Sequence, residues 1–147
     1  MKRTKKGPRE KGSVLMELAL VLPLLILIVM LVLEGSKLVR THQVLNNAAR
    51  EGARLSVQPE NQGVTADITT EVINYASQNG VPLAAGDVTI NQSALIPMPS
   101  GFSISASQVT VTHNYTMSYL SVFTFLGVPG TYTLQGTAEF RNFYKPD

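Results

Sequence analysis

A single carboxylate lies inside the apolar run near the N-terminus of this chain. Between Ser13 and Leu33, Glu17 is the only ionisable side chain. A helix over this run is roughly 31 Å long at about 1.5 Å per residue, enough to cross one bilayer. A carboxylate buried in such a span costs about 2.5–3.5 kcal/mol to insert, and it is by default a candidate functional group. Because Glu17 lies only about one turn into the run, snorkelling to the headgroups is the alternative.

The residues before Glu17 have the order of a processing site. Residues 11–17 are KGSVLME, so a glycine ends a basic leader and a glutamate follows five positions later. This segment resembles a class III signal peptide of the prepilin type, which a membrane aspartic peptidase cuts after the glycine. The resemblance implies cleavage between Gly12 and Ser13, where glycine lets the chain leave helical geometry and enter the peptidase extended. In an assembly, the new Ser13 ammonium of one subunit would then pair with Glu17 of its neighbour.

Positive charge is concentrated ahead of the apolar run. Six of the chain's 12 Lys and Arg residues lie within residues 1–12, whereas only Lys37 and Arg40 follow closely on the far side. The positive-inside rule therefore predicts a cytoplasmic N-terminus and an extracytoplasmic C-terminal part. A cleaved secretory signal is the alternative, but this run exceeds the usual length of ~7–15 residues and no small-x-small site follows it. We therefore expect a single-pass protein of the inner membrane, in contact with its lipid.

The helix that carries Glu17 is expected to continue beyond the membrane. Residues 34–57 contain no proline, and apolar or small residues recur there at helical spacing until Pro59. One helix over about residues 14–57 would be roughly 65 Å long. Pro23 predicts a kink or local melting in the lower half. Rows of small residues in the upper half are expected to contact either the protein's own sheet or another subunit.

The most specific signature lies in the upper half of this helix. It is NNAAREGAR at residues 46–54, and its members from position 47 are Asn47, Ala48, Ala49, Arg50, Glu51, Gly52, Ala53 and Arg54. Together with Gly12, Glu17 and the run ALVLPLL at residues 19–25, this signature resembles the TadE-like family of the Tad (tight adherence, Flp) pilus systems. The resemblance covers roughly residues 12–56. It implies a prepilin peptidase, other pilin-like subunits and the Tad assembly machinery as partners. The spacing of Glu51 and Arg54 predicts an ion pair.

The remaining residues predict a small head. Residues 64–79 have the pattern of a short amphipathic helix, and alternating segments at 88–90, 109–117 and 132–141 predict strands. Residues 102–106 alternate in the opposite phase to Val109, which indicates a bulge or break near Ser107 and Gln108.

Two segments of the head lack regular periodicity. Residues 95–101 contain two prolines and a glycine and are expected to be a turn-rich linker. Residues 119–128 are apolar, and they predict either a buried loop or an exposed contact with a partner or membrane.

These elements predict an α+β fold in which a long N-terminal helix packs against a small antiparallel sheet, as in pilins. Four segments are expected. They are a basic cytoplasmic leader at 1–12, a transmembrane helix at 13–33, its protruding continuation at 34–57, and an extracytoplasmic head at 58–147.

Patterns typical of catalysis are absent from the sequence. There is no cysteine, and His42 and His113 have no carboxylate at ligand spacing. No phosphate loop, nucleophile elbow or paired carboxylates are found. Residues 56–139 contain no Lys or Arg, which disfavours nucleic-acid binding. The sequence thus predicts no catalytic, cofactor or metal site.

The favoured function is that of a non-enzymatic pilin-like protein, a minor pilin or pseudopilin in Tad pilus assembly and surface adherence, located in the inner membrane or the pilus. One alternative is a membrane-anchored periplasmic binding or adhesion module outside any filament. A small anchored hydrolase is a second. Cleavage after Gly12 would distinguish the first from both.

Overall fold

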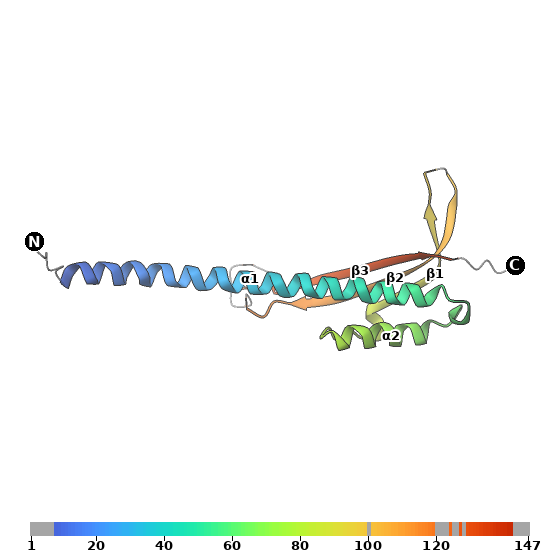
Figure 1. The fold of residues 1–147 in the computed structure, drawn as a ribbon, viewed down its shortest axis with the longest axis horizontal. Helices are drawn as coiled ribbons and strands as arrows, with labels where there is room; N and C mark the ends of the chain where they lie inside the picture. The colour runs from blue at the N-terminus through green and yellow to red at the C-terminus, as the bar shows by residue number, and fades with distance from the viewer. Residues whose placement is uncertain (1–7, 100, 120–123, 125–126, 128, 143–147) are drawn as a thin grey trace, which may run out of the picture.

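The computed structural model describes residues 8–99, 101–119, 124, 127 and 129–142. It contains helices α1 (Pro8–Ser56) and α2 (Thr65–Gln78), strands β1 (Val88–Pro97), β2 (Ser103–Thr116) and β3 (Thr131–Arg141), and short 3-10 turns at Pro59–Asn61 and Ala85–Asp87. Figure 1 shows α1 as a rod that carries the other elements on its C-terminal half. The expected α+β fold, a long N-terminal helix with a small antiparallel sheet, is confirmed.

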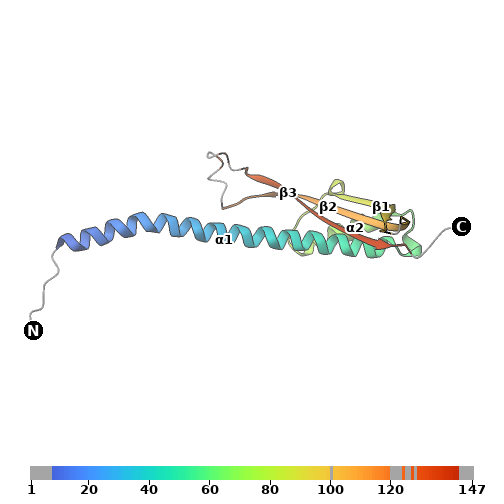
Figure 2. The ribbon, with the colours of Figure 1, turned by 90° about the horizontal axis from the view of Figure 1, so that it is seen from above.

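Helix α1 has two different surroundings along its length. Nearly all side chains of residues 12–33, here called the apolar half, are exposed. Residues 34–56, here called the head half, contact α2 and the sheet. The helix is unbroken across Pro23, and Figure 2 shows it bending in the apolar half. The disturbance expected at this proline is therefore a bend and not a melted turn.

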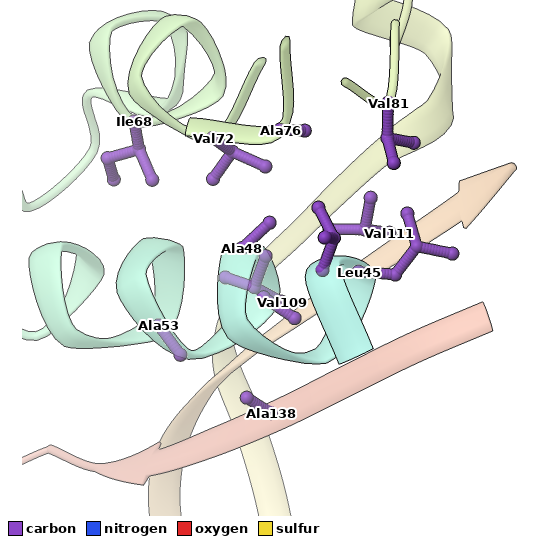
Figure 3. Packing of buried hydrophobic residues seen from close by; sticks show 12 residues of the cluster. Leu45, Ala48, Ala53, Ile68, Val72, Ala76, Val81, Val109, Val111 and Ala138 are labelled. Atoms are coloured by element: carbon purple, nitrogen blue, oxygen red, sulfur yellow. The ribbon is translucent and has the colours of Figure 1, made fainter. Parts of the chain in front are cut away.

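The sheet has three antiparallel strands in the order β1-β2-β3. In the central strand, Val109 is paired with Ile90 on one side and with Ala138 on the other. Inward-facing side chains of β2 pack with both helices, so α1 and α2 cover the same face of the sheet (Figure 3). The helix expected at residues 64–79 corresponds to α2, whose apolar stripe of Ile68, Val72 and Ala76 is buried.

The predicted irregularity near Ser107 is present. The register of β1 and β2 shifts between Asn91 and Ala94, so the extra residue lies in β1, opposite Ser107. Ala106 and Ser107 are consecutive and both buried, so the alternation of inward-facing and outward-facing residues in β2 changes phase at these two positions. Beyond this bulge the two strands leave the body as a projecting hairpin, the arm (residues 94–106; Figure 1).

The prediction of a turn-rich linker at residues 95–101 is partly wrong. Leu95, Ile96 and Pro97 belong to β1, which continues well past Ile90. The turn of the arm is closed by the amide of Met98, which donates to the carbonyl of Phe102 at 2.8 Å. Pro97 is tolerated because it ends an edge strand, where no further ladder hydrogen bond is required of its nitrogen.

Helix α1 and strand β3 approach each other at backbone distance. A Cβ placed on Gly136 would lie 2.5 Å from the carbonyl carbon of Leu45. A glycine is therefore needed in β3 where it crosses α1. This contact holds the sheet directly against the head half.

Candidate functional site

The predicted processing site lies within a continuous helix. Because α1 begins at Pro8, Gly12 lies within the helix. The predicted role in cleavage instead requires an extended chain at this glycine. A Cβ at Gly12 would meet no atom within 4 Å. Glycine is about 1 kcal/mol less favourable than alanine in a helix, so this turn opens more readily than its neighbours. A peptidase acting here must first unwind it.

Glu17 lies on the exposed surface of the apolar half. Within the described part of the chain it makes no hydrogen bond or ion pair. Among the described residues its carboxylate therefore has no counter-charge. The role proposed for Glu17 and Ser13 stays a prediction.

The small residues of the signature at residues 47–54 pack on the protein's own head. Ala48, Ala49, Gly52 and Ala53 are all buried. A Cβ on Gly52 would lie 2.6 Å from Cγ2 of Val72 in α2. Of the two roles left open for these residues, the structure shows packing within the subunit. The small residues of the signature therefore allow α1 to pack closely against the rest of the head.

The polar residues of the same signature face outward. Asn47, Arg50 and Arg54 are exposed. Arg54 forms the ion pair with Glu51 that their spacing predicts, and both guanidinium contacts reach the same carboxylate. The hydrogen bond from Arg54 holds the pKa of Glu51 below its usual value, against a smaller opposing effect of burial. Because the pair is largely solvated, its contribution to stability is small.

A second carboxylate, which sequence reasoning used only as a boundary marker, organises the junction between the two halves of α1. Glu34 is 2% exposed and follows directly after the apolar half. The hydroxyl of Tyr115 in β2 donates to its Oε1 at 2.6 Å. The backbone amides of Ser118 and Tyr119 donate to it at 3.2 and 2.8 Å. These three donors connect the end of β2 to the helix.

The protonation of this cluster follows from its contacts. Burial alone would raise the pKa of Glu34, but the hydrogen bonds from Tyr115, Tyr119 and Ser118, together with the charge of Lys37, lower it below the usual value. Burial and the Glu34 carboxylate raise the pKa of Tyr115 to about 12. Glu34 is therefore ionised and Tyr115 is a permanent donor at neutral pH. We call this set of residues the Glu34 clamp.

Part of the segment 119–128 contributes to the clamp. Tyr119 places its ring 4.0 Å, centroid to ammonium, from Lys37. Most of the remainder of this segment lies outside the described residues, so the choice between a buried and an exposed loop stays open.

The histidines are separate from one another. The ring of His42 is hydrogen bonded to Asn46 at 3.2 Å, and His113 is half-buried in β2. Among the described residues, no group of three His, Cys, Asp or Glu is placed to hold a metal ion.

The molecule thus has one long helix, able by length and composition to cross a membrane, with a small head that contains a second helix and a three-stranded sheet on its C-terminal half. Residues 12–54 match the sequence model of the family described as TadE-like protein, so the resemblance is confirmed. The match covers most of α1 and none of the head. No curated protein and no solved structure matches the chain.

Proposed function

We propose that this chain is a minor pilin or pseudopilin of a Tad pilus, cleaved after Gly12 by a prepilin peptidase and anchored in the inner membrane with its head outside. The observation that carries the proposal is the bare apolar half of α1, which presents Glu17 without a partner among the residues that the structure describes. Helix packing against other subunits would cover this half. The head half is already covered by the chain itself.

Assembly with other pilin-like subunits gives Glu17 its role. After cleavage, Ser13 carries an ammonium one helical turn from Glu17. Within one helix these groups lie near the same end, whereas a neighbour displaced along the axis brings its ammonium to this carboxylate. Such a pair in a low-dielectric bundle favours one register of the two helices. In this proposal the protein functions by packing against other subunits, and no catalytic step is assigned to it.

The decisive experiment concerns processing. The full chain is expressed with and without an active prepilin peptidase, and the intact mass of the membrane fraction is measured. We expect loss of residues 1–12 and a new N-terminus at Ser13 only with the active peptidase. Recovery of only the full-length chain would contradict the proposal.

A matched pair of glycines controls for helix effects. Both Gly12 and Gly35 lie in α1 with open space at the Cβ position. Gly12→Leu should block cleavage, because a bulky side chain stabilises the helix and hinders entry into the peptidase cleft. Gly35→Leu should be cleaved like the parent chain.

A membrane-anchored adhesion module outside any filament is the second candidate, and the arm favours it. One face of the arm carries the half-buried side chains of Ala94, Ile96 and Ile104, and it ends at Phe102, which is 75% exposed. An apolar face on a projecting hairpin is typical of a contact surface. If Phe102→Ser abolishes attachment while uncleaved protein supports it fully, this second function is correct.

A further inference from the structure

A cleft lies beside α1 just beyond its apolar half. It has a volume of about 440 Å³ and is formed by α1, the turn after α2, and β2. Its lining includes Lys37, Arg40, Asn79, His113, Asn114 and Thr116. The volume is within the range of about 300–1,000 Å³ that is usual for ligand sites. We call it the neck cleft.

The neck cleft is positively charged. Lys37 and Arg40 lie three residues apart on one side of α1, and none of the described lining residues is acidic. Lys37 lies over the Tyr119 ring and its charge acts on Glu34, so Arg40 is the basic side chain of the cleft whose charge is not offset by a described residue. Glu34, one turn below, already accepts hydrogen bonds from Tyr115 and two backbone amides. Its carboxylate is therefore held away from the role of counter-ion to Arg40.

Arg40 is available to a ligand. Within the described part of the chain its guanidinium has no ion pair or hydrogen bond, whereas Arg54 on the same helix is paired with Glu51. Guanidinium groups bind phosphate oxygens through two parallel hydrogen bonds. Side-chain amides and hydroxyls of Asn79, Asn114 and Thr116 line the same space and supply uncharged donors.

The neck cleft begins at the level of the phosphate layer of a bilayer, and the long side chain of Arg40, which lies above that layer, is directed back toward it because helix side chains tilt toward the N-terminus. The apolar half ends at Leu33, so the helical rise places Lys37 about 6 Å and Arg40 about 10 Å beyond the hydrocarbon boundary. The polar headgroup layer is roughly 5–8 Å thick on each side of a membrane. The charged side chains of the cleft can therefore reach the level of the lipid phosphates.

We propose that the neck cleft binds the phosphate group of an anionic phospholipid in the outer leaflet. This inference rests on the membrane orientation in the proposed function, but it does not depend on cleavage or on pilus assembly. Lys37 and Arg40 supply the charge, and the polar side chains of β2 and of the turn after α2 surround the headgroup. The site would hold the head at a defined height above the membrane.

Lipid retention by the full chain tests this proposal. The purified protein in detergent is titrated with phosphatidylglycerol or with phosphatidylcholine, whose choline cation offsets the charge of its phosphate and is repelled by Lys37 and Arg40. Bound lipid is counted by native mass spectrometry. Arg40→Gln is compared with Arg50→Gln, because Arg50 is also exposed and unpaired on α1 but lies ten residues further from the membrane. We expect preferential retention of phosphatidylglycerol, about tenfold weaker in Arg40→Gln and unchanged in Arg50→Gln, as for loss of a charge-assisted hydrogen bond.

Other outcomes would overturn the proposal. Equal retention of both lipids, or equal losses in the two variants, would show that lipid binding is non-specific. Displacement of the lipid by inorganic phosphate at equal concentration would indicate a site for a soluble anion. Loss of pilin partners in Arg40→Gln with normal lipid retention would indicate an acidic protein surface as the ligand. Failure of the processing experiment leaves this measurement unaffected, so the two proposals fail separately.

Discussion

The two halves of α1 are one continuous helix with opposite relations to the rest of the chain. The apolar half is rich in Leu, Ile and Val and exposes nearly all of them. The head half buries alanine and glycine, and only Val44 and Leu45 are large apolar side chains in its fully buried set. Residue size is therefore matched to the neighbour. The large side chains of the apolar half are left uncovered by the rest of the chain, whereas the small ones of the head half allow α2 and β3 to approach closely.

The comparison implies that changes in the two halves have different consequences. A change in the apolar half should affect contacts with other molecules and leave the head folded. A change in the head half should affect folding itself.

The largest effect is expected for Glu17→Gln in the apolar half. If Glu17 neutralises the Ser13 ammonium of a neighbour, its loss leaves a buried charge without a partner, which costs about 3–5 kcal/mol. The variant should insert and be cleaved, yet fail to co-purify with pilus partners or support attachment. Co-purification and surface attachment measure this effect. Glu71→Gln on the exposed side of α2 is the control, and normal assembly by Glu17→Gln would identify Glu17 as a snorkelling residue.

The second effect concerns the close contact between α1 and β3. Gly136→Val places side-chain atoms where the backbone of Leu45 lies, so the head should lose about 3 kcal/mol of stability through overpacking. Thermal unfolding of the full chain in detergent, followed by near-ultraviolet circular dichroism, measures the loss. Gly86→Val, at a site with open space, is the control. Equal stability of the two variants would mean that β3 moves away at no cost.

The third effect concerns the junction between the halves. Glu34→Gln replaces the charged acceptor of the Glu34 clamp and should cost about 2 kcal/mol, since hydrogen bonds to a charged group are lost. Tyr115→Phe removes one donor and should cost about 1 kcal/mol. A double-mutant cycle on the free energy of unfolding gives their coupling, and strictly additive values would contradict the hydrogen bond.

The same carboxylate gives a pH dependence with a defined sign. The folded-state pKa of Glu34 is lowered from 4.5, so its contribution is present above that value and is lost as pH falls through the folded-state pKa. The free energy of unfolding of the parent chain should therefore decrease with acidification below about pH 4.5 more steeply than that of Glu34→Gln. Parallel slopes for the two proteins would show that Glu34 has no lowered pKa.

The smallest effect is expected for the exposed pair of the signature. Glu51→Gln should leave the midpoint of thermal unfolding unchanged within error, because a solvated ion pair contributes little. A clear loss of stability would place this pair in a structural role. Unchanged stability with impaired co-purification would instead indicate a contact with a partner.

The sequence predicted what depends on local pattern. Helical spacing indicated α1 and α2, alternation indicated the strands, and the change of phase at Ala106 indicated the bulge. The length of β1 was underestimated, because Pro97 suggests a loop and its tolerance at the end of an edge strand depends on tertiary context.

Long-range contacts could not be predicted in the same way. Glu34 and Tyr115 are 81 residues apart in the chain. An acid at the end of an apolar run is ordinarily solvated, and an alternating tyrosine is ordinarily part of a core, so neither pattern indicates the other.

The Glu34 clamp has a mechanical consequence. An unbroken helix resists twisting, and the three donors from β2 and the residues after it fix the head to α1 close to the boundary of the apolar half. Because neighbouring residues are about 100° apart around a helix, a rotation of the apolar half by one position would swing the arm through the same angle. The direction in which the arm faces is therefore fixed by the rotation of the apolar half about the helix axis.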